Sequence, residues 1–350
     1  MPYSTLLFLL FAWLIALPTQ VAAAPLQRDS AVVLMYHHVG DGRYPSTNIR
    51  LEQFDSHLEF LAQEGFQVWP LARIVARLQA KQPLPDKTIA ITFDDAYKTV
   101  YSEAYPRLKA RGWPFTVFVS SDYIDKKYSN YMSWDQMREM HTHGASYGNH
   151  SSSHDHLTRH HERENSAQWR QRITEDLRDA QQRLEQEFGE TLKIVAYPYG
   201  EYDLPLAELV AELGFVAFGQ QSGPVGHYSD MRFLPRFPVN EAYGNLKSLK
   251  TKLLSLALPV IDAQPLDPVT RDPTPRLTLT FGPSEARLSQ LACYASGQGR
   301  IDLEWIDPTQ RRVEISTSRP LPKGRSRYNC TAPSPETGRY FWFSHPWIVK

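Results

Sequence analysis

The sequence lacks an excess of charge of either sign. Lys and Arg together number 38, Asp and Glu together number 38, and the formal net charge of the 350 residues is zero. Proteins that bind nucleic acids usually carry an excess of basic residues. The balanced charge of this sequence therefore gives no support for a nucleic-acid-binding role. A hydrophobic content of 42% fits a globular protein, and the length allows one large domain and one small one.

Cysteine is equally scarce. The only two, Cys293 and Cys330, lie near the C-terminus. In an exported protein such a pair forms a disulfide, whereas two buried thiols are the alternative. A thiolate metal site is disfavoured because two ligands are too few and no histidine pattern accompanies them.

Long hydrophobic runs are absent except at the N-terminus. Residues 6–17 are apolar but too few to span a bilayer, which needs about 20 residues. Small residues follow, as at a signal-peptidase site, with cleavage expected after Ala23. We therefore predict a signal peptide at residues 1–23, export to the periplasm or the outside, and no stable membrane span after cleavage. The absence of Lys and Arg before the run leaves an uncleaved anchor as the alternative.

From residue 31 to about 260 the pattern alternates between strands and helices, which favours a parallel sheet closed or nearly closed into a barrel. In such folds the active site forms at the carboxyl ends of the strands. Strands are expected at 31–39, 66–69, 89–93, 115–119, 145–149, 194–197 and 215–219, and helices at 51–64, 71–80, about 100–108, 133–140, 166–188 and 204–213.

The pattern changes after residue 261. Four prolines between residues 262 and 275 indicate a linker. Short alternating strands are then expected at 276–281, 287–294, 300–306, 312–317 and 339–343, which predicts a small all-β domain over residues 276–350. Tyr340 and Trp342 alternate there with Phe341 and Phe343, so one face of the last strand packs in the core and the other packs between domains or on sugar rings.

The residues most suggestive of chemistry follow predicted strands. Asp94 and Asp95 end the apolar run 89–93, and His150 and His154 follow the strand 145–149. One carboxylate and two imidazoles can form a facial metal triad with open positions for water and substrate. The second carboxylate is then free to act as a base.

Together these motifs resemble those of the polysaccharide deacetylase family, also called the NodB homology domain or carbohydrate esterase family 4. The run Thr-Phe-Asp-Asp at 92–95 matches its first motif, and His-Ser-Ser-Ser-His at 150–154 matches its second. The resemblance covers roughly residues 31–240. It implies a distorted (β/α) barrel deacetylase domain, placed here at residues 24–261.

Two departures from the family pattern matter. Ala196 stands where many members carry the arginine of a third motif, and Arg236 is a candidate substitute from another strand end. The late histidine motif is missing, but Tyr36-His37 resembles the first strand of the permuted branch that deacetylates poly-β-1,6-N-acetylglucosamine. His37 is therefore the candidate general acid, with His38 expected on the opposite face of the strand.

The resemblance implies a role for each candidate residue. Asp95, His150 and His154 would bind a divalent metal, with zinc favoured and Co²⁺ or Ni²⁺ as alternatives. Asp94 would be the base, and Tyr199 and Arg236 are the candidates for oxyanion or substrate contacts. The implied substrate is a polysaccharide containing N-acetylglucosamine, and no protein partner is indicated.

Two other functions stay open at this stage. One is deacetylation of peptidoglycan or of chitooligosaccharides, which the same site residues would serve. The other is an exported glycan-binding protein with little catalysis, which the missing third-motif arginine suggests.

Overall fold

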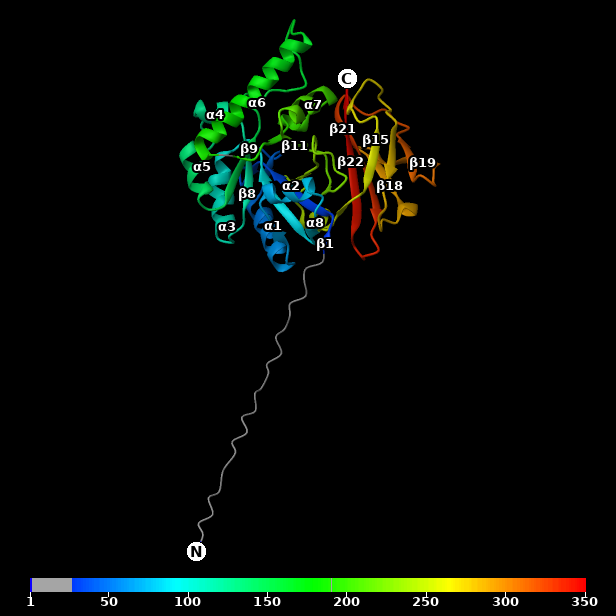
Figure 1. The fold of residues 1–350 in the computed structure, drawn as a ribbon, viewed down its shortest axis with the longest axis horizontal. Coiled ribbons are helices and arrows are strands. Elements are labelled where there is room, and N and C mark those ends of the chain that lie inside the picture. Colours follow the sequence, from blue (N-terminus) through cyan, green and yellow to red (C-terminus); the bar gives the residue numbers. More distant parts are fainter. Residues whose placement is uncertain (2–26, 190) are drawn as a thin grey trace.

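The computed structural model describes Met1, residues 27–189 and residues 191–350. The predicted signal peptide thus falls outside the described residues. Two units lie side by side, an α/β unit and a β-rich C-terminal unit (Figure 1). Within the described part of the chain, no helix has the length and hydrophobicity to cross a membrane.

A curled, mostly parallel sheet forms the centre of the α/β unit. Its order is β11-β10-β9-β8-β7-β2-β12, with β13 also paired to β2 and β5 to β7. These runs are apolar and buried on both faces, as expected of a parallel sheet covered by helices. The strands are β2 (Ser30–Tyr36), β5 (Gln67–Val68), β7 (Thr88–Phe93), β8 (Phe115–Val119), β9 (Ala145–Asn149), β10 (Ile194–Ala196), β11 (Val216–Phe218), β12 (Val225–Gly226) and β13 (Phe237–Pro238); β1 (Gln27–Arg28) pairs with β6 (Leu84–Pro85), and β3 (His38–Val39) with β4 (Asn48–Ile49).

One short segment, residues 234–238, connects the two ends of this sheet. Leu234 bridges Phe218 of β11, and Phe237 pairs with Leu34 of β2. The sheet therefore curls back on itself, and the predicted distorted barrel with a β-rich C-terminal part is confirmed. The side chain between these two contacts, Arg236, points into the interior and is wholly buried.

Helices pack on the outside of the sheet (Figure 1). The longest, α6 (Ser166–Phe188), begins at a capping box formed by Asn165 and Gln168 and buries a stripe that includes Ile173 and Leu177. The others are α1 (Leu51–Gln63), α2 (Leu71–Gln79), α3 (Tyr105–Lys109), α4 (Ser121–Asp125), α5 (Trp134–His141), α7 (Leu204–Glu212) and α8 (Leu246–Leu253), with a π-helical turn at Val100–Ala104 and 3₁₀ turns at Pro198–Gly200 and Leu288–Gln290.

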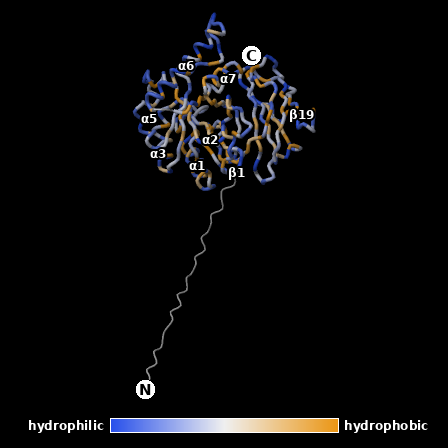
Figure 2. The backbone as a smooth tube through the Cα atoms, viewed as in Figure 1, coloured by the Kyte–Doolittle hydropathy of each residue, from blue (hydrophilic) through white to orange (hydrophobic). Residues whose placement is uncertain are grey.

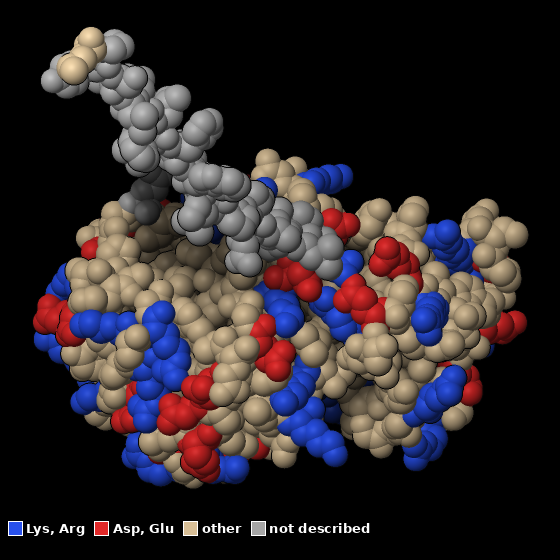
Figure 3. All heavy atoms as spheres, turned by 90° about the horizontal axis from the view of Figure 1, so that it is seen from below, with Lys and Arg blue, Asp and Glu red and all other residues tan. Residues whose placement is uncertain are grey.

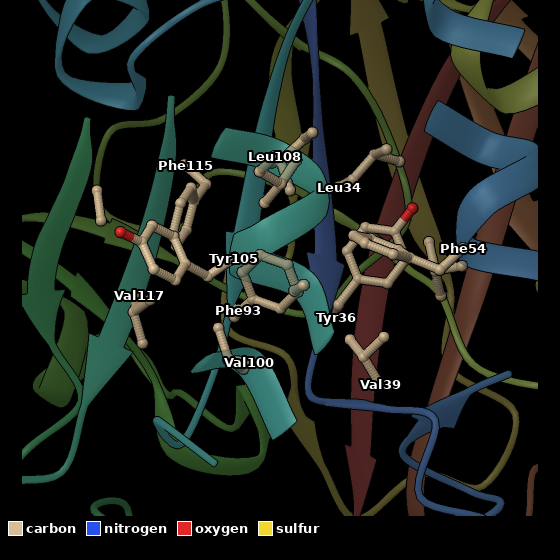
Figure 4. Packing of buried hydrophobic residues seen from close by; sticks show 14 of the residues in the cluster. Leu34, Tyr36, Val39, Phe54, Phe93, Val100, Tyr105, Leu108, Phe115 and Val117 are labelled. Atoms are coloured by element: carbon tan, nitrogen blue, oxygen red, sulfur yellow. The ribbon is translucent and has the colours of Figure 1, made fainter. Parts of the chain in front are cut away.

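The main core lies between the sheet and the helices on one side of it. Aromatic rings meet edge to face there, with Tyr36 and Phe54 5.3 Å apart and Phe93 and Phe115 5.8 Å apart (Figure 4). Hydrophobic residues follow the inner strands, whereas hydrophilic residues dominate the outer end of α6 (Figure 2). This packing holds the carboxyl ends of β7 and β9 in place.

The C-terminal unit is a second curled sheet, largely antiparallel, in the order β14-β22-β21-β18-β19-β20-β17-β15. Cys293 and Cys330 face each other across β18 and β21 and are joined by the predicted disulfide. The strands are β14 (Leu256–Ala257), β15 (Val260–Gln264), β16 (Val269–Thr270), β17 (Leu277–Phe281), β18 (Ala292–Ala295), β19 (Gly299–Asp307), β20 (Arg312–Ser316), β21 (Gly324–Pro333) and β22 (Tyr340–Val349).

Two features of this unit differ from the sequence-based expectation. Residues predicted to form a linker at 262–275 instead contain most of β15 and all of β16. They form strands because their backbones pair with β17 and β22. The proline-rich segment is therefore part of the sheet rather than a free connection. Strand β21 was not predicted at all, and β22 extends beyond its predicted end. The domain boundaries at 261 and 276 stay a prediction.

The two units share an extensive interface. Arg339 of the loop before β22 donates to the carbonyl of Leu254 at 2.8 Å and to the carboxylate of Asp86 at 2.9 Å. Trp342 meets Phe237 edge to face at 5.3 Å, which puts this face of β22 against the α/β unit. Of the alternatives left open for the two aromatic faces of this strand, the structure thus shows interdomain packing for Trp342.

Candidate active site

The candidate residues gather at the carboxyl ends of the parallel strands. Asp94 and Asp95 follow β7, His150 follows β9, and Tyr199 follows β10. Adjacent parallel strands end at the same edge of a sheet, so side chains distant in the sequence meet there. Five of the seven predicted site residues, His37, Asp95, His150, His154 and Tyr199, line one cavity of about 730 Å³.

Three of these side chains converge on a single point. The Oδ1 atom of Asp95 lies 3.2 Å from Nε2 of His150 and 3.0 Å from Nε2 of His154. Their ligand atoms all lie within 4.8 Å of one another, so one ion could contact all three. The arrangement has the one-carboxylate, two-imidazole composition of a facial triad.

The hydrogen bonding of this cluster fits a cation. The Nδ1 atom of His150 lies 2.7 Å from the carbonyl oxygen of Ala196, which can only accept, so Nδ1 carries the proton. In the neutral imidazole Nε2 then presents a lone pair toward Asp95. The Oδ1 atom of Asp95 is buried and has no hydrogen-bond partner. A lone pair facing a buried carboxylate oxygen is repulsive, and a divalent metal between them would remove the conflict.

The loop that carries the two histidines is held by a half-buried acid. Asp176 of α6 accepts hydrogen bonds from the backbone N–H groups of Ser152 and Ser153 at 2.8 and 2.9 Å, and from the Ser153 hydroxyl at 2.9 Å. The hydroxyl of Ser151 accepts from the N–H of His154 at 2.8 Å. The three serines between the histidines therefore fix the loop. The sequence analysis did not identify Asp176, which carries no motif signal.

Asp94 is paired with Arg236, the candidate substitute for the third-motif arginine that Ala196 replaces. Nη1 and Nη2 of Arg236 donate to the two carboxylate oxygens of Asp94 at 2.7 and 2.8 Å, and Nε donates to the carbonyl of Gly219 at 3.0 Å. Burial raises the pKa of Asp94, but the charge and hydrogen bonds of Arg236, together with the charges of His150 and His37, hold the pKa below its ordinary value. Arg236 is itself completely buried, so it does not reach a substrate or an oxyanion directly.

His37 lies where the first strand breaks. Strand β2 ends at Tyr36 and β3 begins at His38, and the Nε2 atom of His37 is 4.0 Å from Oδ2 of Asp95. His37 lines the cavity. His38 is instead buried away from the metal cluster, stacked between the rings of Tyr44 and Tyr97.

Tyr199 occupies a left-handed backbone conformation, with φ 60° and ψ 1°. Its ring stacks on His156 at 4.0 Å and meets His154 edge to face at 4.8 Å. Its carbonyl accepts a hydrogen bond from Arg325 of β21. The loop after β10 is thus fixed both by the metal-cluster histidine and by the C-terminal unit.

Backbone strain concentrates at this site. Among the described non-glycine residues with positive φ are Asp95, Ala96, Ser151, His154 and Tyr199, all of them in the three site loops. Each such residue is energetically unfavourable by about 1–3 kcal/mol and persists only where the surroundings impose it. The left-handed backbone conformation is thus held at or beside the candidate ligand residues.

Tyrosines line much of the remaining cavity surface, which suits a ligand with flat apolar faces such as a sugar ring. Tyr97 and Tyr131 lie together, with ring centroids 5.1 Å apart. The tyrosines of the lining are Tyr97, Tyr123, Tyr131, Tyr199, Tyr202 and Tyr243. Sequence reasoning identified Tyr199 alone, because the others belong to no motif.

Comparison with known proteins shows which proteins this chain resembles. Residues 81–218 match the polysaccharide deacetylase family. YxkH of Bacillus subtilis, assigned as a polysaccharide deacetylase, is 29% identical over 184 residues, or 52% of this chain and 61% of its own length. The poly-beta-1,6-N-acetyl-D-glucosamine N-deacetylase of Escherichia coli K12 is 24% identical over 255 residues, or 62% of this chain and 37% of its own length. The chain thus spans less than two thirds of the length of either relative.

Solved structures show the same fold. IcaB from Ammonifex degensii superposes with a TM-score of 0.56 at 27% identity and covers 66% of this chain and 99% of its own. The deacetylase PplD of Streptococcus pyogenes superposes with a TM-score of 0.57 at 20% identity, with the same coverage. The predicted family resemblance is confirmed: residues 81–218 match the polysaccharide deacetylase model, and the α/β unit shares the fold of these solved deacetylase structures.

Proposed function

We propose that this protein is an exported, metal-dependent hydrolase that removes N-acetyl groups from a polysaccharide containing N-acetylglucosamine and releases acetate. Poly-β-1,6-N-acetylglucosamine or a similar polymer is the proposed substrate. The relatives named for that activity support the substrate class, and the tyrosine-lined cavity suits a chain of sugar rings.

One observation carries the proposal. A candidate metal cluster of Asp95, His150 and His154 lies beside a carboxylate, Asp94, that an arginine holds in its ionised form. A protein that only bound glycans would not need a buried acid-arginine pair, whose burial is costly without compensation. Amide hydrolysis needs such a set, because an unactivated amide must be both attacked and protonated.

Asp95, His150 and His154 would hold the metal, with zinc proposed first because a carboxylate and two imidazoles suit it. When bound, zinc lowers the pKa of a coordinated water and polarises a carbonyl group. The Nδ1–H of His150 donates to the carbonyl of Ala196 and keeps Nε2 turned toward the cluster.

Asp94 is the proposed general base. Its carboxylate accepts the proton of the attacking water as the new bond to the amide carbon forms. The bidentate contact with Arg236 fixes the plane of that carboxylate and keeps it ionised before the reaction. Arg236 is therefore proposed as a positioning residue, in place of the arginine that Ala196 replaces in the third motif.

His37 is the proposed general acid, since it lines the cavity and lies near Oδ2 of Asp95, whereas His150 and His154 lie near Oδ1. In its protonated form it would donate to the nitrogen of the departing amine. The backbone N–H of Tyr199 is proposed to donate to the oxyanion that develops on the acetyl oxygen. The left-handed conformation of Tyr199 and its place in the cavity lining support this role.

The experiment is acetate release by the purified mature chain, residues 24–350, from β-1,6- and β-1,4-linked N-acetylglucosamine oligomers, with added zinc or with chelator. We expect release that chelator abolishes and zinc restores. Asp94→Asn should lower the rate by orders of magnitude while zinc binding persists.

Asp155→Asn is the matched control, because Asp155 follows His154 in the same loop but its carboxylate is exposed. It should retain full activity. Absence of acetate from both oligomers, with one zinc bound per chain, would contradict the proposed function.

A further inference from the structure

The C-terminal unit forms one wall of the active-site cavity. Arg325 and Arg327 of β21 line it, together with their cross-strand partners Ile348 and Pro346 of β22. Residues two apart in a strand and their direct partners share one face of the sheet. This face therefore lines the cavity, with Arg327 half-buried and Arg325 also exposed to solvent.

The two arginines are not neutralised. Among the described residues, neither Arg325 nor Arg327 forms an ion pair with a carboxylate. Arg325 donates to the carbonyl of Tyr199, and Arg327 donates to the hydroxyl of Ser222 at 3.3 Å. Both partners are neutral, so two positive charges face the cavity without a counter-charge.

The carboxylates that line the cavity lie beside histidines and do not pair with the two arginines. The described carboxylates that line it are Asp95, in the metal cluster, and Glu201, which lies 2.7 Å from Nδ1 of His156. A third cation reinforces the imbalance: Lys252 lies 5.4 Å from the ring centroid of Tyr243, which lines the cavity. Burial and the charge of Arg327 lower the pKa of Lys252 to about 8.

From this geometry we propose that Arg325 and Arg327 form an anion subsite beside the reacting centre, and that the polysaccharide substrate carries carboxylate groups on sugars next to the one that is deacetylated. The inference rests on the proposed function and narrows its substrate class. A guanidinium pairs with a carboxylate through two parallel hydrogen bonds, which makes arginine well suited to a carboxylated sugar. Arg325 also links this subsite to the loop of Tyr199, so the carboxylate would lie within a sugar unit or two of the acetyl group.

The test compares oligosaccharides of equal length. One is the neutral β-1,6-linked N-acetylglucosamine oligomer; the second alternates N-acetylglucosamine with glucuronate; the third alternates it with N-acetylmuramate, whose carboxylate is on a lactyl group. Acetate release gives kcat and KM for each, and calorimetry gives the affinity of the zinc-loaded mature chain. The last two oligomers distinguish a uronate from a lactyl carboxylate as the source of the charge.

At least one carboxylated oligomer should bind about 10- to 100-fold more tightly than the neutral one, as charge-assisted hydrogen bonds at two arginines allow. The double variant R325Q/R327Q should lose this preference through KM. R325K/R327K should keep part of it, because the charge remains. Arg300→Gln, an exposed arginine of β19 in the same unit, should have no effect.

Equal affinity for neutral and carboxylated oligomers would overturn the subsite. So would a preference that R325Q/R327Q leaves intact. Failure of the proposed function has a different signature, since no acetate would then appear from any oligomer, while calorimetry would still report whether carboxylates bind through the two arginines.

Discussion

At the scale of single residues, the pair of Asp94 and Arg236 governs both stability and chemistry. Both side chains are completely buried and satisfy each other through two short contacts. A buried carboxylate that loses its counter-ion is strongly unfavourable, whereas removal of both charges is tolerated much better. The same two groups therefore have to be tested together as well as one at a time.

Arg236→Gln should destabilise the fold by about 3–5 kcal/mol, because it leaves the Asp94 carboxylate buried without its cation. Adding Asp94→Asn should recover part of that loss. Chemical denaturation of the two single variants and the double variant measures the coupling. Additive effects would show that the pair contributes no specific interaction.

A second residue-scale prediction concerns metal binding. Asp95→Asn removes the charged ligand of the cluster, so bound zinc should fall from about one per chain to nearly none, as ligand loss at a three-residue site implies. Elemental analysis after dialysis measures the content. The Asp155→Asn chain should keep its zinc, and an Asp95→Asn chain that also kept it would place the metal elsewhere.

At the scale of elements, the sequence predicted the strands and helices that have clear local patterns, but not the contacts between distant segments. The strands 89–93 and 145–149 were predicted within one residue of β7 and β9, and so was the helix 166–188, because apolar runs and a clear cap mark them. The pairing of Asp94 with Arg236 could be proposed only as a guess. It depends on the segment 234–238 bridging β11 to β2, which no local pattern in the sequence encodes.

Strand β21 was missed for a related reason. Its buried side chains, among them Ser326, Tyr328 and Cys330, alternate with polar ones, and two of the buried ones are not strongly hydrophobic. The period-two signal is therefore weak. Arg325 and Arg327 of this strand were therefore missed as cavity residues. Their position in the cavity depends on how the two units pack together.

Strand β22 carries a histidine that should make stability depend on pH. His345 is 3% exposed, and burial lowers its pKa to about 3. An unfolded chain binds a proton at this side chain below about pH 6.5, while the folded chain does not. The contribution of His345 to stability is therefore full at neutral pH and is lost as the pH falls from about 6.5 toward 3.

His345→Phe should thus reduce the stability difference between pH 7.5 and pH 5 by about 2 kcal/mol, the linkage expected for one such group. Denaturant unfolding at the two pH values measures it. Buried His38, whose pKa burial lowers to about 4, should leave part of the pH dependence in place. His161→Phe is the exposed control, and an equal change in that chain would remove the assignment to His345.

At the scale of the whole molecule, the two units behave as parts of one site. Lys, Arg, Asp and Glu are intermixed over the face of the molecule seen in Figure 3. The uncompensated charge lies instead in the cavity between the units. How the units are held together should therefore affect substrate binding as well as stability.

Arg339→Met should loosen that connection, because it removes contacts with Leu254 and Asp86 across the interface. We expect the single unfolding transition to broaden or split in two, with a loss of about 3–5 kcal/mol for breaking a buried ion pair. Calorimetry of the Arg339→Met chain measures this. Arg312→Met, in exposed β20, should unfold as the unaltered chain does, and an unsplit, unshifted transition in Arg339→Met would show that the units are held elsewhere.

The segment 234–238 has a consequence for the order in which the site is completed. Asp94 and its strand precede Arg236 by 142 residues in the chain. A chain that has formed the strands from β2 to β11 but not yet laid this segment between them already carries its metal ligands, while its base still lacks a partner. Activity therefore requires that residues 234–238 close the sheet between β11 and β2. A chain that ends or is cut shortly before residue 234 should bind metal but should not hydrolyse substrate.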